Sequence, residues 1–170
     1  MTASFGIRIG EAFAGEGAEA AHVNIVIGDR SELGPTFALA LASPSTGHTP
    51  FVTVLRPGLP VRPLTLFVNK ATIDGPEHGT LTWGAAQAGV AAGVADAVSE
   101  GIVGEAEAER ALLIAAVWVN PAADDAQAVY ANNRTATYQA LRAGKARLPL
   151  LDDLLSVRNA PFNPFFRPRE

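Results

Sequence analysis

A histidine and an asparagine lie two residues apart in an otherwise apolar segment, residues 21–28. Side chains alternate along an extended strand, so His22 and Asn24 are expected to share one face. The opposite face is apolar and comprises Val23, Ile25 and Ile27. An imidazole titrates near neutral pH and can both donate and accept a proton. Held on a rigid strand, His22 is therefore a candidate acid–base group, and the alternative is a structural histidine whose nitrogens are satisfied by hydrogen bonds.

Two further polar residues indicate ligand contacts. Lys70 falls in a strand predicted over residues 64–73, where it shares a face with Thr72 and must reach solvent or an anionic partner. Gln87 lies near the start of a helix predicted over residues 84–99, and its carboxamide offers donors and an acceptor to a heterocyclic ligand. Either residue can also be an ordinary solvated side chain.

Several kinds of chemistry are excluded by composition or spacing. The chain has no cysteine, which removes disulfides, thiolate nucleophiles and cysteine-based zinc sites. His22, His48 and His78 are far apart and lack the spacing of a helical ligand pair, so we expect no metal. The sequence has no Gly-x-Ser-x-Gly elbow, and the glycines at 15 and 17 lack both a Walker lysine and a third dinucleotide glycine.

Length and charge limit the partners. The chain has 170 residues, 48% of them hydrophobic, and a formal net charge of −4, which suits one compact domain and argues against nucleic acid as a partner. Residues 81–98 contain Gln87 and Asp96 and make a poor membrane span. Arg8 and Glu11 interrupt any apolar signal-peptide core, so we expect a cytoplasmic protein with no membrane partner.

The hydrophobic pattern predicts a mixture of strands and helices. Strands are predicted over residues 5–10, 21–28, 51–55, 64–73 and 111–119, and helices over 36–42, 84–99 and 126–142, with a further short helix over 148–155. Pro35 is expected at the entry of the first helix. Gly89 and Gly93, four residues apart, predict a close approach of their helix to a neighbour rather than a membrane dimer.

Taken together, several segments resemble the formaldehyde-activating enzyme family. They are Gly10–Ala12, Ala21–Gly28, Leu59–Pro60, Pro63, Thr65–Leu66, Asn69–Ile73, Gly84–Ala91, Asp96–Val98 and Ala122–Ala126. Their order and spacing agree from about residue 6 to residue 142. The resemblance implies a lyase that condenses formaldehyde with tetrahydromethanopterin, its co-substrate, in one-carbon metabolism. It also implies an α/β (α+β) two-layer sandwich like the second domain of ribosomal protein S5, with a mixed sheet, helices packed on one face, and a homopentamer with active sites between subunits.

The resemblance also assigns roles to individual residues. It implies that His22 is the catalytic proton donor and that the pterin-binding positions are Asn24, Val52, Lys70, Thr72 and Gln87. Three positions depart from the family pattern: Asn24 replaces an aspartate, Val52 a leucine and Ala88 a histidine. An amide at position 24 keeps hydrogen bonding but loses the negative charge that would stabilise a cationic iminium.

Two other functions are compatible with the same residues. One is a non-catalytic homologue that binds or senses a pterin or a one-carbon compound. The other is a structural assembly protein whose aromatic tail, Phe162, Phe165 and Phe166, packs on a neighbouring subunit. Under each reading residues 1–170 form one domain, in which residues 145–170 are a divergent C-terminal tail.

Overall fold

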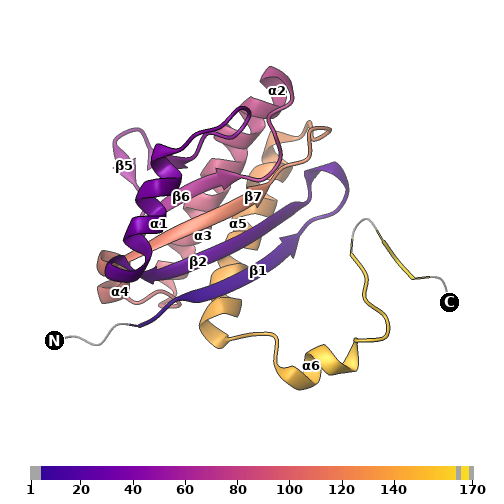
Figure 1. Ribbon diagram of the computed structural model, residues 1–170. Coiled ribbons are helices and arrows are strands. Elements are labelled where there is room, and N and C mark those ends of the chain that lie inside the picture. Colours follow the sequence, from indigo (N-terminus) through magenta and orange to yellow (C-terminus); the bar gives the residue numbers. More distant parts are fainter. Residues whose placement is uncertain (1–4, 164–165, 169–170) are drawn as a thin grey trace.

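A computed structural model describes residues 5–163 and 166–168 and shows a five-stranded mixed sheet with helices packed against it (Figure 1). The strands are β1 (Arg8–Ala14), β2 (Ala21–Asp29), β3 (Phe51–Val52), β4 (Val54–Arg56), β5 (Leu59–Pro60), β6 (Leu64–Asn69) and β7 (Ala111–Trp118). The α-helices are α1 (Arg30–Ala42), α2 (Gly75–Thr80), α3 (Gln87–Ser99), α4 (Glu105–Arg110), α5 (Ala126–Ala146) and α6 (Leu151–Ser156). A short 3-10 turn, η1 (Gly17–Glu19), precedes β2, and a π-helical segment, η2 (Leu81–Ala86), leads into α3.

The sheet has the strand order β1-β2-β7-β6-β3. β2 pairs antiparallel with both β1 and β7, β6 runs parallel to β7, and β3 pairs antiparallel with β6. β4 and β5 form a separate two-stranded sheet. The mixed α/β architecture implied by the sequence is thereby confirmed, and β2 is held by neighbours along both of its edges.

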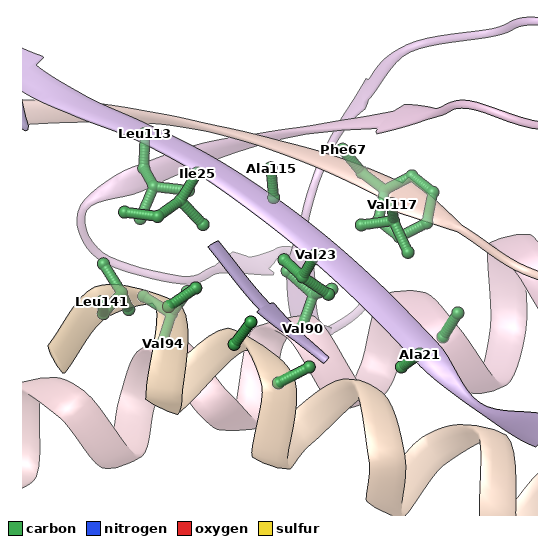
Figure 2. Packing of buried hydrophobic residues seen from close by; sticks show 14 of the residues in the cluster. Ala21, Val23, Ile25, Phe67, Val90, Val94, Leu113, Ala115, Val117 and Leu141 are labelled. Carbon is green, nitrogen blue, oxygen red and sulfur yellow. The ribbon is translucent and has the colours of Figure 1, made fainter. Parts of the chain in front are cut away.

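The main core lies between one face of the sheet and the helices α3 and α5. Val23 and Ile25 of β2 are fully buried there, and Figure 2 shows them directed towards the helix layer, where Val90 and Val94 of α3 lie. The two helices also contact each other closely. This core follows from the apolar alternation in β2, and it leaves the other side chains of the strand on the opposite face.

Glycines set the spacing between α3 and α5. A Cβ on Gly89 would collide with the carbonyl oxygen of Tyr130, and a Cβ on Gly93 with that of Arg134. The prediction that these glycines serve close helix packing is confirmed. Arg134 also joins the two helices by pairing with Asp96, at 2.6 Å from Nε to the carboxylate.

A third helix covers part of the other sheet face, so the expectation that helices pack on one face is wrong for α1. Leu33 and Phe37 of α1 are buried against a second apolar cluster that includes Val26 of β2 (Figure 1). The chain turns back over the sheet directly after β2 because Asp29 caps the helix, accepting from the Ser31 N–H at 3.1 Å. The Ser31 hydroxyl also donates to Asp29, at 2.9 Å. These two hydrogen bonds from Ser31, together with the nearby Arg110 guanidinium, lower the pKa of Asp29. Pro35 consequently lies inside α1 rather than at its entry.

Other element boundaries also differ from prediction. β1 spans Arg8–Ala14 rather than residues 5–10, because it pairs with β2 in continuous register from Arg8 opposite Ile27 to Ala14 opposite Ala21. β6 ends at Asn69, which leaves Lys70 and Thr72 beyond the strand. α6 buries none of its residues. Within the described part of the chain, no helix combines the length and apolar character needed to cross a membrane.

Candidate active site

His22 and Asn24 lie on the face of β2 that points away from the main core. α1 covers this face at the Val26 end and leaves the His22 end open. The side chain of His22 is therefore 33% exposed to solvent. The register places Phe13 of β1 on one side of His22 and Trp118 of β7 on the other. The polar pair is therefore accessible, yet it stands on a strand that is fixed along both edges.

The imidazole of His22 faces a carboxylate. Its Nε2 lies 2.9 Å from Oε1 of Glu11, which comes from the adjacent strand β1. Because a carboxylate oxygen accepts, Nε2 carries a hydrogen and donates it to Glu11. The ring also lies 5.6 Å from the Phe13 ring, centroid to centroid, in a tilted arrangement. The strand pairing thus builds a proton donor whose reactive nitrogen is oriented by a negative charge.

Asn24 stands between His22 and Lys70. Its Nδ2 lies 3.4 Å from His22 Nε2, and its Oδ1 lies 3.4 Å from Lys70 Nζ. The contact with Lys70 is a long hydrogen bond, whereas the amide N–H faces a ring nitrogen whose hydrogen already points to Glu11. The structure therefore brings three of the predicted site residues, His22, Asn24 and Lys70, together. Of its two neighbours, Asn24 forms a hydrogen bond only with Lys70.

A cleft of about 780 Å³ opens beside His22. Its lining comes from β1, the turn that follows, β2 and the C-terminal tail: Glu11, Phe13, Gly15, Glu16, Gly17, Ala20, His22, Phe162, Asn163 and Arg167. The sequence reasoning did not identify Glu11 or Phe13 as site residues, although both alternate with buried positions of β1. In the tail, the Arg167 guanidinium lies 5.5 Å from the centroid of the Phe162 ring, Phe166 is exposed, and Phe165 lies outside the described residues.

Val52 and Gln87 lie in a second hollow, of about 430 Å³, which shares no lining residue with the His22 cleft. Its lining comprises Thr49, Phe51, Val52, Val54, Trp83 and Gln87. The Gln87 carboxamide is paired with the backbone of Val54, accepting from its N–H at 2.9 Å and donating to its carbonyl at 3.2 Å. One N–H and one lone pair of Gln87 are left for a ligand. The predicted pterin-binding residues are thus divided between two places in a single chain.

The remaining histidines have different surroundings. His48 Nε2 lies 3.1 Å from the hydroxyl of Thr72. His78 is buried, with Nε2 3.1 Å from the Val119 carbonyl and Nδ1 accepting from the Asp74 N–H at 3.0 Å, so it is a structural histidine. Across residues 5–163 and 166–168, no group of three or more His, Cys, Asp or Glu side chains is arranged to hold a metal ion.

Comparison with known proteins relates the chain to a family. The model of the formaldehyde-activating enzyme (Fae) family matches residues 9–166, which contain every predicted site residue. The chain is 42% identical over 159 residues to the bifunctional enzyme Fae/Hps of Archaeoglobus fulgidus, a match that covers 93% of this chain and 40% of that protein. A bifunctional Fae/Hps of Methanococcoides burtonii is 42% identical over 152 residues, covering 89% of this chain and 38% of that protein.

A third relative matches almost end to end. The 5,6,7,8-tetrahydromethanopterin hydro-lyase of Methanosarcina barkeri is 37% identical over 158 residues, covering 92% of this chain and 89% of that protein. The chain spans about two fifths of the bifunctional relatives. The match also runs through residues 145–166, where divergence stays a prediction. With a family model that covers nearly all of it, the chain belongs to the formaldehyde-activating enzyme family.

Proposed function

We propose that this chain condenses formaldehyde with tetrahydromethanopterin to give methylene-tetrahydromethanopterin and water. The observation that carries the proposal is the His22–Glu11 pair, with 2.9 Å between Nε2 and Oε1, beside an open cleft in a chain of this family. The reaction needs one proton donor, a negative charge nearby and room for a bicyclic substrate. The outer face of β2 supports each of these requirements.

The reaction places a specific demand on His22. A secondary amine of the pterin adds to formaldehyde and gives a carbinolamine, whose hydroxyl is a poor leaving group until it is protonated. His22 donates a proton to that oxygen, water departs, and the resulting iminium is attacked by the second amine of the pterin. The proton released at ring closure restores His22, so the sum is formaldehyde plus the pterin giving the methylene product and water.

Glu11 supports this step in two ways. Its carboxylate orients the Nε2–H of His22 from 2.9 Å, and it places a negative charge next to the position where the cationic iminium forms. Asn24, which carries no charge, cannot provide the second effect. The chain therefore retains one carboxylate at the site even though position 24 is an amide.

The experiment measures methylene-tetrahydromethanopterin formation above the spontaneous rate, with His22→Gln as the test variant. Glutamine keeps a hydrogen-bonding side chain but cannot supply the proton, so we expect a loss of about 100-fold or more in the catalysed rate. His78→Gln is unsuitable as a control because His78 is buried. Glu109→Gln, an exposed position of α4 that lines neither hollow, should leave the rate nearly unchanged. A native protein no faster than the spontaneous reaction would contradict the proposal.

The separation of the two hollows supports a homo-oligomer, with a homopentamer as the proposed state. One copy would supply the His22 cleft and its neighbour the Val52 and Gln87 hollow, so a complete site needs two copies. We expect His22→Gln and Gln87→Ala proteins to be weakly active alone and to regain activity when they are unfolded together and reassembled. Unchanged activity after mixing would indicate that each site lies within one chain. Because Gln87→Ala also removes the pairing with Val54, its unfolding temperature is measured first.

A second candidate function is a non-catalytic protein that binds or senses a pterin or a one-carbon compound. The observation that favours it is Asn24, whose amide lacks the charge of an aspartate and forms only one long hydrogen bond, with Lys70. This reading predicts saturable binding of tetrahydromethanopterin by calorimetry without any acceleration of product formation. Binding together with turnover would exclude it.

A further inference from the structure

The turn between α1 and β3 lies against the segment that follows β6. The turn is closed by two backbone hydrogen bonds between Ser45 and His48, each 2.9 Å long. The neighbouring segment, residues 69–73, carries Lys70 and Thr72. Since β6 ends at Asn69, the sheet does not extend far enough to hold these two side chains in place. The turn holds the segment on both sides of Lys70, at Asn69, Thr72 and Ile73.

The His48 side chain bridges the segment on both sides of Lys70. Its Nδ1 lies 2.9 Å from the carbonyl oxygen of Asn69, and its Nε2 lies 3.1 Å from Oγ1 of Thr72. A carbonyl oxygen only accepts, so Nδ1 carries a hydrogen. In the neutral ring Nε2 is then an acceptor, and the Thr72 hydroxyl donates to it. Because Thr72 is exposed, its oxygen can then accept a hydrogen bond from a ligand N–H.

Gly47 completes the attachment through its carbonyl oxygen. That oxygen accepts from the Asn69 Nδ2 at 2.8 Å and from the Ile73 N–H at 3.1 Å. Gly47 has a φ of +74°, and a Cβ there would collide with Cγ2 of Thr72, so the turn fits against the segment only with glycine at this position. The backbone N–H of Lys70 is held separately, by the Val117 carbonyl at 2.8 Å.

We propose that His48 is a positioning residue, which holds residues 69–73 so that Lys70 reaches Asn24 and Thr72 presents an oxygen acceptor to the ligand. The contribution of this arrangement to pterin binding rests on the proposed function, whereas the attachment itself does not. His48 touches neither the His22 cleft nor the second hollow. Its effect is therefore exerted through Thr72 and Lys70.

The attachment is tested on the ligand-free protein by amide hydrogen exchange. His48→Ala should accelerate exchange at the Ile73 N–H, which bonds to the turn, by about five- to tenfold, the loss expected for one neutral hydrogen bond. Exchange at the Lys70 N–H, which bonds to β7, should change much less. Thr46→Ala alters an exposed side chain of the same turn and is the matched control. An unchanged Ile73 rate in the His48 variant overturns the proposal.

The role in binding is tested with the dissociation constant of tetrahydromethanopterin. We expect His48→Ala to weaken binding by about five- to tenfold, to raise KM more than it lowers kcat, and to show no additional effect when combined with Thr72→Ala. His48→Asn keeps a donor near the Asn69 carbonyl, and His48→Gln keeps a polar group near Thr72. Partial rescue of binding by glutamine supports the proposal.

Two outcomes separate the possible failures. Faster exchange at Ile73 with an unchanged dissociation constant would show that His48 acts only on the fold, and would overturn the positioning role. If the native protein neither binds nor converts tetrahydromethanopterin, the proposed function fails instead, and the exchange measurement still decides whether His48 holds the segment. If His48→Ala does not fold, the asparagine and glutamine variants carry the same comparison.

Discussion

The two faces of β2 carry side chains of opposite character on one stretch of backbone. On the inner face, Val23 and Ile25 retain 0% exposure and belong to the same core cluster as residues of α3 and α5. On the outer face, His22 retains 33% and contacts a carboxylate from β1. Consecutive residues thus contribute alternately to the core and to the candidate active site.

The difference shows how a small chain can hold a reactive group in place. The inner residues fix the strand in the sheet, and the pairing of β2 with β1 then sets the position of His22 relative to Glu11. No loop has to be ordered for this pair to form. The outer face is left open only where α1 does not reach, so access and rigidity come from neighbouring parts of the same sheet.

A substitution on the inner face should lower the stability of the protein without changing any side chain of the outer face. Ile25→Ala should lower the free energy of unfolding by about 2–5 kcal/mol, because it leaves a cavity in a fully packed core. Val26→Ala, the next residue on the opposite face, is only half-buried and should cost about 1 kcal/mol. Chemical denaturation measures both. Equal losses would show that the two faces contribute alike to stability.

The alternation of polar and apolar residues was sufficient to predict these faces. It placed His22 and Asn24 together, and the four-residue spacing of Gly89 and Gly93 separately identified these glycines of α3 as packing residues. It did not set the bounds of β1, because the pattern of Phe5, Ile7 and Ile9 resembles a buried strand although Ile7 and Ile9 are exposed. Pairing with β2 decides where β1 runs, and a single segment carries no information on that pairing.

The candidate site was predictable only in part for the same reason. Lys70 was expected on a strand, but β6 ends one residue earlier, where the Asn69 side chain bonds to the carbonyls of Gly47 and Ala71. Glu11 was missed because its partnership with His22 depends on the register between two strands. His48, considered only as a metal ligand, contacts a segment 21 to 24 residues away.

The role of the outer face in catalysis is tested by removing the negative charge of Glu11, which orients His22. Glu11→Gln keeps a side chain of the same size but replaces the carboxylate 2.9 Å from Nε2, so we expect a fall of about tenfold in kcat with little change in the unfolding free energy, as Glu11 is exposed. Glu16→Gln removes an equal charge from the same cleft and serves as the control. A similar fall in both variants would mean that the cleft needs negative charge in general and that the contact with His22 has no special role.

The smallest effect is expected at position 24, where the outer face has an amide between the imidazole of His22 and the ammonium group of Lys70. In Asn24→Asp, a carboxylate could accept from Lys70 and stabilise the iminium, but it would also stand directly across the strands from Glu11, and like charges in opposing positions repel. Because Glu11 is well exposed, the repulsion is screened and the attraction should prevail, giving a rise of about threefold in kcat. Lys70→Met provides the decisive background. Without the ammonium group, the new carboxylate has only Glu11 and His22 beside it, so the gain should disappear or reverse, and a gain that persists would show that Lys70 does not act through position 24.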